Sequence, residues 1–196
     1  GKEEKFSFDC QPGISCFNVC CADVNIVLSP LDILRMSRRI GMSTSKFLEE
    51  HTIVPFTEDQ KLPFVFLKMN EDKKRTCPFV TEQGCSIYED RPWPCRMYPV
   101  GLASPENPSD QGEEFYFIMQ EDHCKGHEEN KRWSIREWIQ DQGVEEYQEA
   151  GELFKEILLH PYLSKRSLDP ARMEMFYMAC YDLDKFRKFV FESRFL

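Results

Sequence analysis

Several patterns that mark common catalytic and binding sites are missing from this chain. It has no glycine-rich phosphate loop, no G-x-S-x-G nucleophile elbow and no H-E-x-x-H pair of histidines. Nucleotide binding and the standard hydrolytic mechanisms therefore find no support in the sequence. The spacing C-x₂-C is also absent, which removes the usual zinc-finger, zinc-ribbon and ferredoxin patterns.

The chain also lacks an excess of basic residues and any long apolar run. Its 196 residues include 25 Lys and Arg against 34 Asp and Glu, a formal net charge of −9. Because a polyanion binds to a basic face, we expect no nucleic-acid partner. No stretch of about 18 apolar residues occurs, so we expect no membrane span. The first residues show no apolar core of a secretory signal, and the expected location is cytoplasmic.

Cysteine is the residue that the chain does have in quantity. Nine are present, and a first cluster is followed by a second one within a proline-rich stretch. In a reducing compartment, clustered cysteines are more typical of metal ligands than of disulfides. The odd count and the adjacent pair Cys20-Cys21, whose mutual bridge would be strained, also favour metal. Disulfide bonding remains the alternative.

The chemistry of sulfur limits the choice of metals that these cysteines would bind. Thiolate is a soft ligand that selects zinc, iron–sulfur clusters or cuprous copper. A zinc ion or a cubane cluster takes about four such ligands. We therefore expect zinc or iron, an iron–sulfur cluster included, in one or two sites. The candidate ligands number eight: Cys10, Cys16, Cys20, Cys21, Cys77, Cys85, Cys95 and Cys124. Cys180 lies in a helical pattern without a nearby thiol and is expected to be an inert buried residue.

Neighbouring residues on an extended backbone point in different directions. Cys20 and Cys21 are therefore expected to serve two metals, or two irons of one cluster. Arg91 and Arg96 are candidates to compensate thiolate charge, or else they pair with nearby acidic residues or with solvent. His123 and His127 flank Cys124 and are either further ligands or surface histidines of a polar turn.

Short elements are expected around these clusters. The pattern predicts strands over 24–28, 62–69 and 115–119, and a return strand over 73–79 as hairpin partner of 62–69. Ser29, Pro30 and Asp32 predict a capped helix start, and Ser43 predicts a second one. Residues 102–114 are polar and rich in Pro, Ser and Gly, which predicts a loop.

The last third of the chain is helical in pattern. Ser134 with Glu137 repeats the capping box, and further helices are expected over 144–160, from Asp169-Pro170, and after Asp182 or Asp184. The predicted fold class is α+β: a small irregular cysteine-rich metal-centred domain with short strands and hairpins, and a C-terminal helical part. We expect a cysteine-cluster domain over 1–127 and a helical extension over 128–196 that packs on it in one compact unit.

The residues also show a family resemblance. The run C-P-F-V…G-C-S-I-Y-E-D-R-P-W-P-C-R-M-Y-P, from Cys77 to Pro99, follows a cluster that ends in C-C. It resembles the CxxCxxCC family, a YkgJ-type group described as zinc- or iron-chelating. The family pattern C-P-F-L…C-x-I-Y…R-P…C-R-x-Y-P matches nearly throughout, with Val80 in place of leucine. Cys124-Lys125-Gly126 is similar to the family's late cysteine. The first cluster departs from the family name, because its spacing is C-x₅-C-x₃-C-C.

The resemblance implies metal chelation by these cysteines over roughly residues 8–127, and it supplies no reaction. The expected function is a metal-binding protein with a structural or metal-handling role. The alternative is an iron–sulfur enzyme or redox module; a related domain in a flagellin lysine N-methylase makes protein modification an analogy. A third hypothesis is an interaction module, in which the helical part, with Trp133 and Trp138, presents a surface that binds a partner protein. Whether the chain is an enzyme stays open, and no protein partner is identified.

Overall fold

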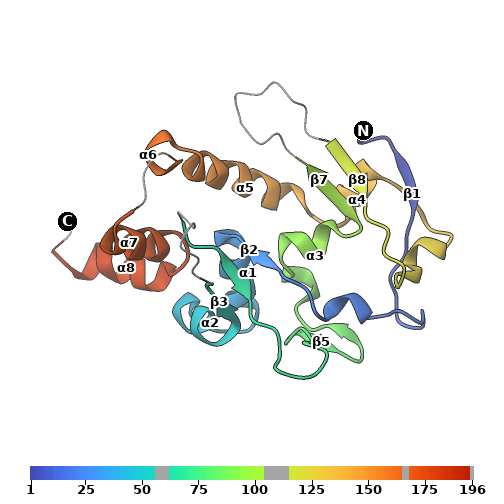
Figure 1. The fold of residues 1–196 in the computed structure, drawn as a ribbon, viewed down its shortest axis with the longest axis horizontal. Helices are drawn as coiled ribbons and strands as arrows, with labels where there is room; N and C mark the ends of the chain where they lie inside the picture. Colours follow the sequence, from blue (N-terminus) through green and yellow to red (C-terminus); the bar gives the residue numbers. More distant parts are fainter. Residues whose placement is uncertain (56–61, 104–114, 165–167, 195–196) are drawn as a thin grey trace.

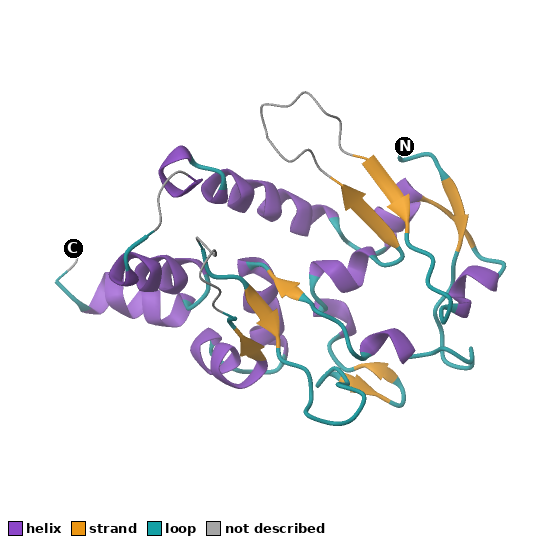
Figure 2. Ribbon diagram, viewed as in Figure 1, coloured by secondary structure: helices purple, strands orange, loops and turns teal. Residues whose placement is uncertain are grey.

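The computed structural model describes residues 1–55, 62–103, 115–164 and 168–194. Within these ranges the chain forms eight α-helices, three short 3₁₀ segments and small sheets of two or three strands. Figure 2 shows short strands scattered among the helices, with helices alone in the C-terminal part. The predicted α+β class, with its C-terminal helical part, is confirmed.

The first half of the described chain is built from short elements. In order they are β1 (Lys5–Ser7), η1 (Val19–Cys21), β2 (Val27–Leu28), α1 (Pro30–Arg39), α2 (Thr44–His51), β3 (Thr52–Ile53), β4 (Val65–Leu67), β5 (Val80–Thr81), β6 (Gly84–Cys85), η2 (Tyr88–Asp90) and α3 (Trp93–Met97).

The second half begins with strands and ends with helices. In order they are β7 (Val100–Ala103), β8 (Phe115–Ile118), η3 (Lys125–Glu128), β9 (Arg132–Ser134), α4 (Ile135–Asp141), α5 (Glu145–Leu158), α6 (Pro161–Ser164), α7 (Pro170–Cys180) and α8 (Leu183–Glu192).

The predicted helix starts are confirmed by hydrogen bonds. At α1 the Ser29 hydroxyl accepts from the Asp32 N–H, and the Asp32 carboxylate accepts from the Ser29 N–H, which completes a capping box. Ser134 and Glu137 form the same reciprocal pair at α4. Such boxes satisfy backbone donors that the first helical turn leaves without partners.

The sheet around β4 corrects one prediction. β4 pairs antiparallel with both β2 and β3, in the order β2-β4-β3. Residues 73–79 therefore do not return beside 62–69; instead Thr76 forms an isolated bridge with Ala22. The hairpin in this region is the two-residue β5–β6 pair. The prediction was wrong because it paired 62–69 with the segment that follows it in the sequence, whereas the strands that pair with β4 come earlier in the chain.

The predicted loop over 102–114 is partly replaced by a strand. Leu102 and Ala103 belong to β7, where they pair with Tyr116 and Phe115 of β8. The remaining residues of that prediction, 104–114, lie outside the described residues. The strand expected over 115–119 is confirmed as β8, one residue shorter than predicted.

Two hydrophobic cores organise the molecule. The first gathers side chains of α1, α2 and β4 together with Phe79, Ile87 and the distant Tyr181. The second joins Phe8 and Met97 to the apolar face of α4. In Figure 1, β1, α4 and the β7–β8 pair lie at one end and α7 and α8 at the other, with α5 running along the molecule.

The helical part is joined to the rest by polar contacts as well. The Asp184 carboxylate accepts from the Thr44 N–H at 2.6 Å and from the Thr44 hydroxyl at 2.8 Å, while the Asp184 N–H donates to that hydroxyl at 3.0 Å. Beside them, the Ser45 hydroxyl donates to Asp182 at 2.5 Å. The N-terminal turns of α2 and α8 thus cap each other. In the described chain, no helix has the length and apolar character that a membrane crossing requires.

Candidate metal centre

The second cysteine cluster is carried by a tight hairpin and a short helix. Gly84 closes the β5–β6 turn with a φ of 111°, a conformation that favours glycine because it has no Cβ. After η2, Pro92 caps α3 and Pro94 lies in its first turn, where the missing N–H of proline costs no helical hydrogen bond. Cys85 ends the hairpin and Cys95 lies within α3, so both are set in constrained backbone.

The first cluster runs alongside this hairpin. A Cβ atom at Gly84 would lie 3.1 Å from the Phe17 ring, so the hairpin touches the segment that precedes η1. The Cys77 N–H donates to the Cys21 carbonyl at 2.8 Å. Segments some 55 residues apart in sequence are therefore held side by side, with cysteines in both.

Four thiols form one electrostatic group, which we call the second thiol group: Cys21, Cys77, Cys85 and Cys95. Burial raises the pKa of Cys77, and the Cys85 thiol adds to that rise. Burial raises the pKa of Cys95 to about 12, with contributions from Cys77 and Cys85. Cys95 is exposed as a whole residue, whereas its thiol group is surrounded by protein.

The other four thiols form the first thiol group: Cys10, Cys16, Cys20 and Cys124. Burial raises the pKa of Cys10 to about 11, and Cys20, Cys16 and Cys124 each raise it further. The backbone confirms the proximity, since the Lys125 N–H donates to the Cys16 sulfur at 3.1 Å and the Asp9 N–H donates to the Gly126 carbonyl at 3.0 Å. The N-terminal segment that contains Asp9 and Cys16 therefore lies beside the turn at residues 124–126.

Cys20 and Cys21 are the junction of the two groups. Both lie in η1, and their side chains are hydrogen-bonded to each other. That bond lowers the pKa of Cys20 to about 7 and raises the pKa of Cys21, because one thiol donates to the other sulfur. Cys20 also raises the pKa of Cys10, whereas Cys77 and Cys95 add to the rise in the pKa of Cys21, to which Cys20 contributes most. Each of the adjacent residues is therefore close to its neighbour and to one of the two groups.

The sulfurs are neighbours, and they do not form a finished coordination shell. Across the described ranges, no three or more His, Cys, Asp or Glu side chains are in position to hold a metal ion. All nine cysteines are free thiols. The donor set nevertheless fits zinc or iron, because four soft sulfurs per group is the number that a structural zinc or a cubane cluster takes.

Cys180 stands apart from both groups. It packs against the first core at the end of α7, and burial is the only cause that raises its pKa to about 11. The two histidines beside Cys124 have other contacts. The His127 ring nitrogen lies 3.0 Å from the Met119 carbonyl, and His123 lies 3.5 Å from the Glu121 carboxylate.

Two buried arginines belong to the segment that carries Cys85 and Cys95. Arg91 and Arg96 are each 7% exposed. The Arg91 guanidinium lies 3.6 Å from the centre of the Tyr88 ring, donates to the Tyr88 carbonyl at 3.1 Å, and donates to the Gln142 side-chain oxygen. Arg96 donates to the carbonyls of Arg91 at 3.0 Å, of Gln142 at 2.6 Å, and of Glu89. All these acceptors are neutral.

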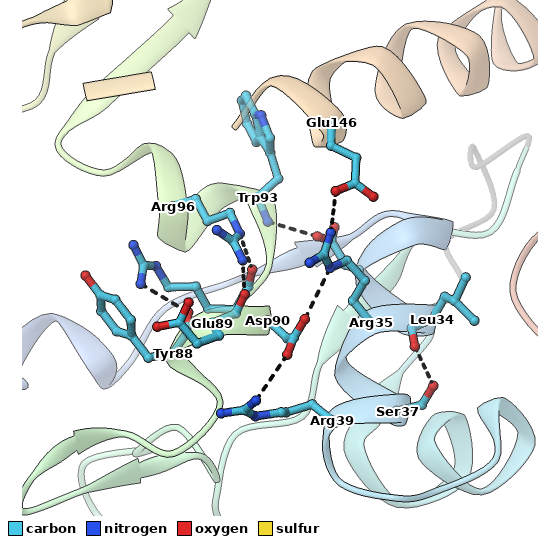
Figure 3. Close-up of polar contacts among 12 residues, drawn as sticks. Leu34, Arg35, Ser37, Arg39, Tyr88, Glu89, Asp90, Trp93, Arg96 and Glu146 are labelled. Carbon is cyan, nitrogen blue, oxygen red and sulfur yellow. Dashed lines mark hydrogen bonds and ion pairs between the residues drawn. The ribbon is translucent and has the colours of Figure 1, made fainter. Parts of the chain in front are cut away.

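The acidic residues nearby are engaged elsewhere. Figure 3 shows Asp90 between Arg35 and Arg39 of α1, with N–O distances of 3.2 and 3.7 Å. Arg35 also reaches Glu146 of α5 at 2.6 Å. The alternative that Arg91 and Arg96 pair with nearby acidic side chains is not seen among the described residues. Arg96 donates to the backbone carbonyl of Glu89, and no ion pair with the Glu89 carboxylate is found, as Figure 3 shows.

Sequence reasoning missed two residues that build this site. The sequence predicts Asp32 only as a cap of α1, and its second oxygen also accepts from the Trp93 N–H at the start of α3. Gln142 was not singled out, although its side chain and its carbonyl accept from the two buried arginines. Both contacts join segments more than 40 residues apart, and no local pattern in the sequence marks them.

One of the comparisons with known proteins finds a family. Residues 9–125 match the model of the family CxxCxxCC, described as a "putative zinc- or iron-chelating domain". The matched range contains all eight candidate cysteines and excludes Cys180. No curated protein and no solved structure matches the chain.

Proposed function

The chain belongs to the CxxCxxCC family, and we propose that it binds zinc or iron in two sites, each made of four cysteine thiolates. The first thiol group is assigned to one site and the second to the other. The observation that carries the proposal is that distant cysteine-bearing segments lie together: the Cys77 N–H donates to the Cys21 carbonyl, and the Lys125 N–H donates to the Cys16 sulfur. We assign the adjacent Cys20 and Cys21 to different sites, so that the two four-sulfur sets share no ligand.

The proposed role is structural. A metal ion with four sulfur ligands has no open position for a substrate. Each group also lies against one core, since Cys77 and Cys85 pack on the first core and Cys124 packs on the second. Metal at both sites would link the segments that pack on the two cores, and the free energy of metal binding would add to the stability of the fold. Eight thiolates require reducing conditions, which supports a cytoplasmic location.

Metal analysis under anaerobic conditions tests the proposal. We expect about eight metal-bound thiols and two zinc ions, or two clusters, per chain, and unfolding when a chelator removes the metal. A colourless protein indicates zinc, and a brown one with absorption near 400 nm indicates iron–sulfur clusters. A single equivalent of zinc, or a chain that keeps its fold after complete metal removal, contradicts the two-site structural proposal.

Cysteine variants test the assignment of ligands. Cys16→Ser should remove metal from the first site only, and Cys77→Ser from the second only. Cys180→Ser is the matched control, because that thiol lies outside both groups and should leave the metal content unchanged. Loss of both equivalents in each single variant would point to one shared cluster in place of two sites.

A further inference from the structure

An open groove lies between β1 and β8, at the end of the molecule that also holds α4 and β7 (Figure 1). Its volume is about 550 Å³, and it is lined by residues 4–7 and 116–118 together with Gln120 and His127. The face of a sheet contributes every second residue to a surface, whereas successive residues line this groove. The groove therefore runs along the edges of β1 and β8, which belong to two separate two-stranded sheets.

The edge of β1 on the groove side offers backbone hydrogen-bonding groups. β1 pairs antiparallel with β9, and just beyond this pairing the Phe8 N–H donates to the Lys131 carbonyl at 2.9 Å. Hydrogen-bonded and non-hydrogen-bonded positions alternate in such a ladder, so the N–H and carbonyl groups of Lys5 and Ser7 point away from β9. In the described part of the chain, no hydrogen bond reaches these groups.

The edge of β8 has the same arrangement. β8 pairs antiparallel with β7, and just beyond this pairing the Met119 N–H donates to the Pro99 carbonyl at 2.8 Å. By the same alternation, the backbone N–H and carbonyl groups of Tyr116 and Ile118 point away from β7, and none of them has a partner among the described residues. Such edges are templates for a further strand, because an extended backbone repeats its donors and acceptors at the same spacing.

The charges beside the groove favour an acidic ligand. Lys2 and Lys5 lie on the β1 side, and neither has a carboxylate within ion-pair distance in the ranges that the structure describes. The Lys2 ammonium lies 5.7 Å from the centre of the Tyr116 ring, so this side chain reaches β8 from the β1 side. Glu4, the acidic residue that lines the groove, is paired with the amino group of Gly1 at 3.5 Å. Two cations therefore remain available to the carboxylates of a ligand.

We propose that the groove between β1 and β8 binds an extended acidic segment of a partner protein. The segment pairs through its backbone with both strand edges, and its carboxylates meet Lys2 and Lys5. Its carbonyls accept from four N–H groups, the edge amides of Lys5, Ser7, Tyr116 and Ile118. The bound strand joins the two small sheets into one. This interaction surface goes beyond metal binding and does not depend on which metal the cysteines hold.

Amide-resolved hydrogen exchange of the full chain, purified anaerobically, tests the proposal. The probes are acetylated and amidated hexapeptides that alternate Glu with Val, Ile or Tyr. At saturating peptide, exchange of the edge amides should slow by at least about tenfold, because each of them gains a hydrogen bond. The amides of Phe6 and Phe117 are internal references and should change less, since the ladders with β9 and β7 already engage them.

Two sets of control peptides separate backbone pairing from charge. The same hexapeptides with N-methyl groups on alternate amides cannot pair as strands, and they should lose the protection. Hexapeptides with Lys in place of Glu should bind at least about tenfold more weakly, a difference of about 1.4 kcal/mol. Equal binding of the Glu and Lys peptides, or of the methylated and unmethylated ones, overturns the proposal.

Proline variants test the β1 edge from the protein side. Ser7→Pro removes one N–H that faces away from β9, and it should weaken the Glu peptides by about tenfold. Arg132→Pro is the matched control, because Arg132 lies opposite Ser7 in β9 and its N–H points away from β1. Equal affinities of the two variants contradict the proposal. Should Ser7→Pro fail to fold, Lys5→Glu decides: it should weaken the Glu peptides and strengthen the Lys peptides, and no change in either overturns the role of the groove.

The remaining outcomes also decide. Unchanged exchange of the edge amides with every Glu peptide, at concentrations up to millimolar, overturns the proposal. A dimer in sedimentation experiments, with the edge amides protected in the absence of peptide, assigns the groove to a second copy of the chain and likewise overturns it. Metal analysis is a separate measurement, so a chain that binds peptide but no metal contradicts only the proposed function.

Discussion

The carboxylate of Asp32 accepts a hydrogen bond of 2.9 Å from the backbone N–H of Trp93. Its other oxygen accepts from the N–H and the hydroxyl of Ser29, each at 2.7 Å. One buried side chain therefore caps α1 and also holds the first turn of α3, the helix that carries Cys95. The contact couples the scaffold of the first core to the proposed second metal site.

This relationship predicts a large effect for Asp32→Ala. Removing the carboxylate leaves buried donors without partners at the starts of two helices, and we expect a loss of about 3 kcal/mol in the free energy of unfolding. Zinc affinity at the second site should fall too, because Cys95 loses its support. Urea unfolding and zinc competition measure the two effects. Asp32→Asn keeps one acceptor oxygen and should lose less; an unchanged midpoint in Asp32→Ala would refute the argument.

A second prediction concerns the pH dependence of the junction between α2 and α8. Hydrogen bonds from Thr44 hold the pKa of Asp184 below its ordinary value of 3.8. The unfolded chain therefore binds the proton more readily than the folded chain, so this contribution is present above pH 3.8 and is lost as pH falls below it. Acid also releases metal, which makes the total change uninformative by itself.

The comparison of wild type with Asp184→Asn isolates that contribution. The stability difference between the two proteins, measured by urea unfolding, should be largest at neutral pH and should shrink as the pH falls through the carboxylate range. Glu137, whose pKa is also lowered by hydrogen bonds at its own capping box, titrates in both proteins and cancels in the difference. A difference independent of pH would rule out the Thr44–Asp184 linkage.

The parts of this structure that sequence could predict are those with a local cause. The capping boxes of Ser29 with Asp32 and of Ser134 with Glu137 lie within four residues, and both form as expected. The prediction of a hairpin strand over 73–79 was wrong because Thr76 pairs with Ala22, more than 50 residues away. A local pattern favours a strand partner that is close in sequence, whereas tertiary packing places a distant segment beside this one.

The candidate site also has features that the sequence predicts and features that it does not. Sulfur chemistry and clustering predict the eight cysteines as ligands, which stays a prediction, and the sequence leaves two alternatives open for Arg91. The contact of Arg91 and Arg96 with the distant Gln142, at the end of α4, follows only from tertiary packing. Buried polar contacts between distant segments leave no periodic signal in a single sequence.

A third prediction concerns the helical extension. We propose that residues 128–196 fold with 1–127 as one unit, because each core mixes side chains from both. Trp138 packs edge-on to Phe8 at 5.4 Å in the second core, and Tyr181 is 2% exposed in the first. A chain ending at residue 127 should therefore show no cooperative urea transition, even with zinc. A cooperative transition near that of the full chain would instead establish 1–127 as an independent domain.

Point substitutions in the full chain test the same proposal. Trp138→Ala should cost about 3–5 kcal/mol, the usual range for a large aromatic side chain removed from a core. Leu153→Ala in α5 is a suitable control, since that side chain is 66% exposed and its loss should change stability by less than about 0.5 kcal/mol. Similar small losses in both variants would show that the extension is not part of the cooperative unit.

The last prediction concerns the close approach of the chain at Gly126. A Cβ atom there would lie 2.7 Å from the Phe8 ring and 2.8 Å from the Asp9 carbonyl, and the second contact is with backbone that cannot rotate away. Gly126→Ala should cost about 1–3 kcal/mol. It should also weaken zinc binding at the first site alone, because Cys10 and Cys124 flank the displaced segments.

Gly151→Ala is the matched control for that substitution. A Cβ at Gly151, within α5, meets nothing within 4 Å, so alanine should stabilise the helix by about 0.5–1 kcal/mol and leave zinc binding unchanged. Urea unfolding and zinc competition in both variants separate the two effects. If Gly126→Ala loses stability yet keeps full affinity at the first site, the 124–126 turn supports the fold without positioning ligands, and Cys124 loses its place among them.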